Sequence, residues 1–139
     1  MIKKILIALD GSENAYKALD YAIQLAIDYS AQLNLLTVVP DFEPKSNEES
    51  AYQRMLVERA ESYLEVAKEE IEETDQDIKF ETEIVYGDPA EKIITIADNK
   101  QVDLIVLGNR GLSGVKRWVL GSVSDRVSDY APCAVLIVK

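Results

Sequence analysis

Short apolar segments alternate along the chain with longer segments in which apolar residues recur every three or four positions. The short segments are rich in Ile, Val and Leu and end at turn residues or charges, which predicts five strands, at residues 2–9, 33–39, 78–86, 103–107 and 133–138. Several of them are apolar on both faces, as expected of strands that helices cover on two sides. Segment 78–86 instead alternates polar and apolar residues, which predicts an edge strand with one solvated face.

Four helices are predicted between the strands. Two long apolar stripes indicate the first two helices, one formed by Ala15, Ala18, Leu19, Ala22, Ile23 and Ala26 and the other by Tyr52, Leu56, Ala60, Leu64, Ala67 and Ile71. A third helix is expected to begin at Asp88, where Pro89 suits the first turn and Glu91 completes a capping box. A fourth follows Gly121, with Val123, Val127 and Tyr130 on one side. This alternation predicts an α/β fold in which right-handed crossovers wrap a parallel sheet.

The composition fits one globular domain over residues 1–139, since 47% of the residues are hydrophobic and no linker or low-complexity tract divides the chain. The apolar run 5–9 is shorter than a signal peptide requires, and no apolar stretch approaches the length of a membrane span. Cys133 is the only cysteine, and the chain has no histidine to activate it. A buried, unreactive thiol and a reducing, cytoplasmic setting are therefore expected.

The net charge of −10 is concentrated in one segment. Residues 41–83 hold fifteen acidic and five basic residues, which accounts for the whole net charge, whereas the rest of the chain has ten of each. Residues 108–117 carry three basic residues and no acidic one. This distribution disfavours general nucleic-acid binding and leaves room for a small anion at one site.

Residues 108–122, GNRGLSGVKRWVLGS, contain four of the six glycines together with those three basic residues. Gly121 and Ser122 precede the fourth predicted helix, whose free N–H groups and dipole favour an anion. Ligands of parallel α/β sheets bind beyond the carboxyl ends of the strands, where the sequence LDGS at residues 9–12 also lies. If the first and fourth strands are neighbours, both loops open on one crevice that can hold a polyphosphate.

Purely structural explanations compete with an anion site. Ser122 and Asp125 form a possible capping box, Gly111 and Gly114 could shape a surface turn, and Asp10 or Ser12 could cap the following helix. Two known phosphate loops are excluded, because no glycine precedes a lysine, as in a P-loop, and no G-x-G-x-x-G follows the first strand. The coincidence of the features at one end of the sheet favours a ligand site.

The spacing of Gly108, Gly111 and the pair Gly121 and Ser122 resembles the G-x2-G-x9-G-[ST] signature of the universal stress protein family. The resemblance spans the chain, from ILIALDGSENAYKALDYAIQLA through GDPAEKIITIADNKQVDLIVLGNRG to LGSVSDRVSDYAPCAVLIVK. It implies a three-layer fold with five parallel strands in the order 3-2-1-4-5, which makes the first and fourth strands neighbours. It also implies an ATP-binding member, because family members that keep these glycines bind ATP.

The same resemblance implies roles for individual residues. Asp10 corresponds to the acid near the ribose and a metal ion, and its carboxylate can accept hydrogen bonds from hydroxyls and hold Mg²⁺ through water. Ala8 and Leu9 line the same turn, where some members have proline and threonine. The other implied contacts are Val39 with the adenine, Leu107 and Gly108 with the sugar, and Gly111, Gly121, Ser122, Val123 and Ser124 with the phosphates.

Three functions remain open on the sequence. The leading one is a regulatory protein that binds ATP with Mg²⁺ and changes its partner interactions according to whether the nucleotide is bound. The sequence does not distinguish ATP from AMP or a cyclic nucleotide as the ligand. The second is a slow ATP hydrolase or phosphotransferase, for which no positioned acid–base pair is evident. The third is a nucleotide-independent interaction module that uses the acidic helix.

The last predicted strand favours self-association. Residues 133–138 form an edge in the order 3-2-1-4-5, yet they carry no charge, and Pro132 lies only at their start. We therefore expect a symmetric homodimer through the edge from Cys133 to Val138, as the family resemblance also suggests.

Overall fold

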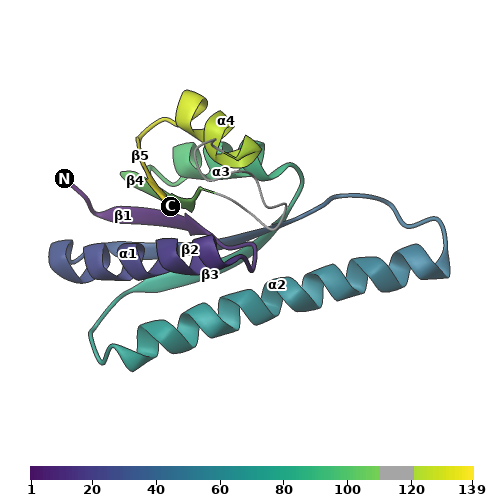
Figure 1. The fold of residues 1–139 in the computed structure, drawn as a ribbon, viewed down its shortest axis with the longest axis horizontal. Coiled ribbons are helices and arrows are strands. Elements are labelled where there is room, and N and C mark those ends of the chain that lie inside the picture. Colours follow the sequence, from purple (N-terminus) through teal and green to yellow (C-terminus); the bar gives the residue numbers. More distant parts are fainter. Residues whose placement is uncertain (110–120) are drawn as a thin grey trace.

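The protein is a five-stranded parallel sheet with two helices on each face (Figure 1), in a computed structural model that describes residues 1–109 and 121–139. The strand order is β3-β2-β1-β4-β5. Both the α/β class and this order confirm the sequence-based predictions. The elements are β1 (Lys4–Ala8), α1 (Glu13–Tyr29), β2 (Gln32–Val39), α2 (Asn47–Glu73), β3 (Phe80–Tyr86), α3 (Pro89–Asn99), β4 (Leu104–Gly108), α4 (Ser122–Tyr130) and β5 (Ala134–Val138).

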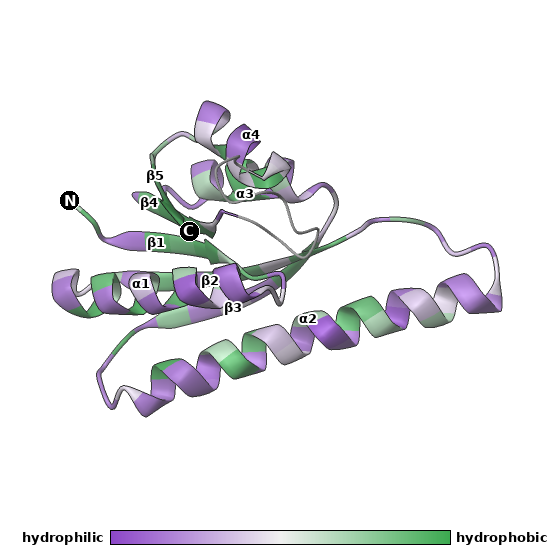
Figure 2. Cartoon of the chain, in the orientation of Figure 1, coloured by the Kyte–Doolittle hydropathy of each residue, from purple (hydrophilic) through white to green (hydrophobic). Residues whose placement is uncertain are grey.

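Alternation along the central strands divides the core into two layers. Ile5 and Ile7 of β1 face α1 and α2, whereas Leu6 faces α3 and α4, and all three are at most 1% exposed. Because successive side chains of a strand point to opposite faces, a strand covered on both sides must be apolar throughout. The green central strands in Figure 2 show this pattern.

Helix α2 is only partly attached to the body of the protein. Its buried residues, Ala60, Leu64, Ala67 and Ile71, all lie from the middle of the helix onward. The first half projects past the sheet (Figure 1), and Tyr52 is 52% exposed. The helix that the stripe from Tyr52 to Ile71 predicted is therefore confirmed, but only part of the stripe is buried, and the ring of Tyr52 lies 6.3 Å from that of Phe42.

The register brings together the two loops that the sequence singles out. Strand β1 lies between β2 and β4, with Ala8 paired with Leu36 and Ile7 paired with Val106. All pairs are parallel, so the carboxyl ends of β1 and β4 lie side by side at the same end of the sheet. Sequence patterns alone did not determine that the first and fourth strands are neighbours.

Strands β3 and β5 are the two outer strands of the sheet. Strand β3 pairs with β2 and forms one edge of the sheet, as its alternating sequence predicts. Strand β5 forms the other edge beside β4. The described residues contain no helix that is both long and apolar enough to cross a membrane.

Candidate functional site

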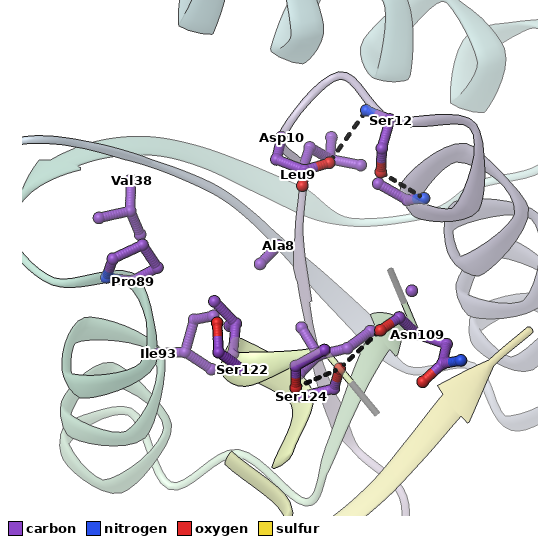
Figure 3. A pocket seen from close by; sticks show the side chains of 15 residues that line it. Ala8, Leu9, Asp10, Ser12, Val38, Pro89, Ile93, Asn109, Ser122 and Ser124 are labelled. Atoms are coloured by element: carbon purple, nitrogen blue, oxygen red, sulfur yellow. Dashed lines mark hydrogen bonds between the residues drawn. The ribbon is translucent and has the colours of Figure 1, made fainter. Parts of the chain in front are cut away.

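A pocket of about 300 Å³ opens at the end of the sheet where the strands terminate, between the carboxyl ends of β1 and β4. Figure 3 shows Asp10 and Ser12 on one side of it, with Ser122 and Ser124 across from them. The pocket lies on the side of the sheet where parallel α/β folds bind their ligands. Its described lining consists of Ala8, Leu9, Asp10, Ser12, Ala15, Val38, Pro89, Ile93, Leu107, Gly108, Asn109, Gly121, Ser122, Val123 and Ser124.

The turn between β1 and α1 presents the Asp10 carboxylate. Gly11 has a φ of +83°, a conformation that favours glycine, and the chain reverses there. The Ser12 N–H donates to Oδ1 of Asp10 (2.9 Å), while Oγ of Ser12 accepts from the Ala15 N–H (3.2 Å). Ser12 is therefore the residue that caps α1. Asp10 itself is exposed and is left to face the pocket.

The opposite side of the pocket is the N-terminus of α4. The N-cap is Gly121, which has no side chain to cap the helix, and Ser122 is the first helical residue. The competing explanation, in which Ser122 and Asp125 form a capping box, is therefore excluded. Asp125 is the first residue whose N–H finds an acceptor within the helix, the Gly121 carbonyl (2.9 Å). The N–H groups of residues 122–124 have no acceptor inside α4, which favours an anion at this end.

Hydrogen bonds attach the start of α4 to the end of β4. The Gly121 N–H donates to the Asn109 carbonyl (3.0 Å), and the Ser124 hydroxyl donates to the same oxygen (3.0 Å). Ser124 is only 3% exposed. Of the two groups that Ser124 could offer a ligand, its hydroxyl thus has an internal acceptor, which leaves the backbone amide as the better candidate.

Gly108 has a packing role that the sequence did not indicate. A Cβ atom there would lie 2.7 Å from the carbonyl carbon of Asn14 and 2.9 Å from the Ala15 nitrogen. Both are backbone atoms of the first turn of α1, so neither can move without shifting the helix. The glycine thus allows α1 to approach β4 closely, and the contact with a sugar stays a prediction.

An apolar wall completes the pocket, and most of it was missed by the sequence analysis. It includes Val38 of β2 together with Pro89 and Ile93 of α3. Val39, predicted to contact adenine, is not in the described lining, and its carbonyl accepts from the Gly87 N–H (2.9 Å). Adjacent strand residues face opposite sides. Leu36 belongs to the same core layer as Ile93, and Val38, two residues further along β2, faces the same side of the sheet.

Nine of the eleven predicted site residues line the pocket. The exceptions are Val39 and Gly111, and Gly111 lies outside the described residues, as do Arg110, Lys116 and Arg117. The lining residues that the analysis did not assign to the site are Ser12, Ala15, Val38, Pro89, Ile93 and Asn109.

Charge around the pocket is sparse in the part of the chain that the structure describes. Asp10 is the one ionisable residue of the described lining. Arg126 of α4 forms an ion pair with Asp88 (3.0 Å), whose carboxylate also accepts from the Glu91 N–H and so caps α3 as predicted. Within residues 1–109 and 121–139, no three Asp, Glu or Cys side chains cluster as a metal site. Asp10 therefore remains the only metal candidate that the sequence and the described pocket share.

The model of the universal stress protein family matches residues 1–139. A universal stress protein of Bacillus subtilis, YxiE, is 37% identical, and the alignment covers 100% of both chains. The solved structure of UspA from Lactobacillus plantarum has a TM-score of 0.88 at 28% identity, covering 99% of this chain and 98% of that one. A universal stress protein solved in complex with cAMP has a TM-score of 0.78 at 26% identity, covering 99% of this chain and 97% of that one.

Proposed function

Because the chain belongs to the universal stress protein family, we propose that its pocket binds an adenine nucleotide, and that this nucleotide is ATP with Mg²⁺. The observation that carries the proposal is the meeting of two groups across one pocket: the exposed Asp10 carboxylate at the end of β1 and the uncapped start of α4. The similar protein solved with cAMP supports an adenine nucleotide as the ligand class.

Each side of the pocket suits one part of such a ligand. The apolar wall of Val38, Pro89 and Ile93 can cover a base, since nucleotide bases are flat and largely apolar on their faces. The Asp10 carboxylate can accept hydrogen bonds from the ribose hydroxyls. The backbone amides at the start of α4 can donate to phosphate oxygens, where the helix dipole also favours negative charge.

The donor set at Asp10 fits Mg²⁺ in the way in which nucleotide sites usually hold it. Mg²⁺ keeps several waters and is bound through one or two carboxylates together with the phosphates of the substrate. A single exposed carboxylate can take part in that arrangement. The ion would supply positive charge to the polyphosphate, which the described lining does not provide.

Calorimetric titration tests the ligand directly. We expect the wild-type protein to bind ATP more tightly with Mg²⁺ than with EDTA, and Asp10→Asn to lose the gain from Mg²⁺. Parallel titrations with AMP and cAMP separate the nucleotides, and mass spectrometry of nucleotide released from fresh protein identifies the natural ligand. Absence of binding to all three nucleotides at millimolar concentration would remove the proposal.

We propose binding rather than turnover because the described lining contains one ionisable residue, Asp10. A general acid–base mechanism needs groups that can take up and give back a proton at the reacting atoms. Release of inorganic phosphate from ATP, followed over hours, measures any turnover. A steady release that Asp10→Asn abolishes would favour the hydrolase instead.

The regulatory part of the proposal concerns α2. The projecting half of this helix borders a second cavity of about 620 Å³, whose residues include Asp41, Arg54, Glu58 and Tyr86. We propose that a protein partner meets this surface and that nucleotide occupancy changes the contact. Hydrogen exchange of α2 amides with and without ATP tests the link, and equal exchange in both states would contradict it. We also propose that the protein acts as a cytoplasmic homodimer, paired through β5.

A further inference from the structure

The ring of Tyr63 lies against the turn that carries Asp10. A Cβ atom built on Gly11 would lie 2.5 Å from Cζ and 2.6 Å from Cε1 of Tyr63. These distances mean that the ring is in contact with the glycine and leaves no space for a side chain. Tyr63 comes from the middle of α2, is partly buried and packs on the core layer between the sheet and α1. The loop and the helix are therefore in direct contact.

Gly11 determines where the Asp10 carboxylate is held. Its left-handed φ of +83° brings the Ser12 N–H to Oδ1 of Asp10 at 2.9 Å. Glycine is the residue with the most backbone freedom, so a side chain packed against it restricts the conformations that the turn can adopt. Asp10 is exposed and gives little packing of its own. The Tyr63 ring supplies a wall that the turn itself lacks.

The electrostatics of a neighbouring tyrosine agree with this arrangement. Burial raises the pKa of Tyr16 on α1, and the charges of Tyr63 and Asp10, followed by Glu70, raise it further. Tyr16 therefore interacts electrostatically with both Tyr63 of α2 and the Asp10 carboxylate of the pocket. Tyr63 does not belong to the described lining, and its contact with Gly11 is a route by which it can act on a ligand through the turn.

We propose that Tyr63 is a positioning residue of the pocket: by packing on Gly11 it holds the Asp10 turn in the shape that presents the carboxylate to the ligand. This inference rests on the proposed nucleotide function and extends it to a residue of the acidic helix. It also gives α2 a physical connection to the pocket, through one side chain and one glycine.

Binding of ATP with Mg²⁺ to a set of variants tests the role. We expect Tyr63→Ala to raise Kd about tenfold and Tyr63→Phe, which keeps the ring, to change Kd less than about twofold. In the Asp10→Ala background the same Tyr63→Ala change should leave Kd unaltered, because the residue acts through Asp10. An unchanged Kd in Tyr63→Ala, or an equal loss in both backgrounds, would overturn the proposal.

A control separates positioning from general stability. Ile71→Val loosens the packing of α2 far along the helix from Gly11, at a side chain that is 2% exposed. We expect it to lower the melting temperature while leaving Kd unchanged. Tyr63→Leu serves in place of Tyr63→Ala where the alanine variant does not fold, because leucine fills part of the space without supplying the ring. A Kd raised as much by Ile71→Val as by the Tyr63 variants would contradict a specific role.

Hydrogen exchange of the Ser12 amide gives a test that needs no nucleotide. This amide is bonded to Asp10, so its exchange reports how often the turn opens. We expect faster exchange in Tyr63→Ala than in wild type, Tyr63→Phe or Ile71→Val. If wild-type protein binds no nucleotide, the proposed function fails, and the exchange still decides whether Tyr63 holds the turn. Equal exchange in all four proteins would overturn the inference.

Discussion

At the scale of single residues, two glycines at the pocket are needed for different reasons. Gly108 is required because backbone atoms of α1 occupy the space where a side chain would go. Gly121 has φ of −64° and ψ of 157°, a conformation that any residue can adopt. Its lack of a side chain matters because it lines the pocket and exposes the start of α4. The first glycine therefore supports the fold, and the second supports the site.

Replacing Gly108 with alanine should destabilise the protein. The added Cβ would meet the Asn14 carbonyl carbon at 2.7 Å, so α1 must shift away from β4. We expect a loss of about 1–3 kcal/mol in the free energy of unfolding, the usual cost of overpacking, measured by urea denaturation. Ser122→Ala is the control, because this side chain is exposed at the first position of α4. An equal stability in both variants would mean that α1 adjusts freely.

Replacing Gly121 with valine should remove nucleotide binding and leave the fold largely intact. Its backbone conformation suits a β-branched residue, and its N–H bond to Asn109 can persist. The isopropyl group would project where the phosphates are proposed to lie, so we expect Kd for ATP to rise by at least about a hundredfold, measured by calorimetry. Tight binding by a folded variant would place the phosphates elsewhere.

At the scale of elements, the contact between α1 and α2 contains a carboxyl pair. Burial, followed by the hydrogen bond and charge of Asp20 on α1 and the charge of Glu73, raises the pKa of Glu70 to about 7. An isolated glutamate titrates near 4.5. The folded protein therefore holds a proton that the unfolded chain releases between these values. Stability from this group is full below pH 4.5 and is lost as the pH rises through 7.

Glu70→Gln should remove that loss, because the amide stays neutral and can still donate to Asp20. We expect the melting temperature at pH 8 to rise by about 3 °C, equivalent to ~1 kcal/mol in a chain of this size, with little change at pH 4. Thermal melts from pH 4 to pH 8 measure the profile. Glu69→Gln, at an exposed neighbouring position, should follow the wild type. A parallel shift of Glu70→Gln at every pH would show that the two carboxyls share no proton.

The elements also show why the sequence predicted most of the architecture and less of the pocket. Strands and helices follow from apolar periodicity, which is a local property of the sequence. The bounds of the five strands differ from the predicted ones by no more than two residues. Val38, Pro89 and Ile93 join the pocket only because β2 and α3 meet above the sheet, which no local pattern encodes. The exposure of Tyr52 has the same origin, since a stripe cannot tell how far a helix extends beyond its sheet.

At the scale of the whole molecule, the sheet has two edges that differ in protection. Strand β3 carries Glu81 and Glu83, and Lys100, the residue that follows α3, forms ion pairs with both, at 3.4 and 3.5 Å. Strand β5 has an apolar sequence from Ala134 to Val138, and β4 is its partner in the sheet. Charged side chains discourage pairing at an edge, and their lack invites it. We therefore expect two copies to pair through β5, not β3.

Ile137→Pro tests this dimer at one backbone group. The Val138 carbonyl accepts from the Asn109 N–H, so Val138 turns toward β4, and the N–H of the preceding Ile137 points to the open edge. Proline removes that N–H and is tolerated where the N–H faces outward from an edge strand. Light scattering at micromolar concentration should find a dimer for the wild type and a monomer for the variant, with nucleotide binding retained, because Ile137 does not line the described pocket. A monomeric wild type, or a variant that stays dimeric, would place the interface elsewhere or remove it.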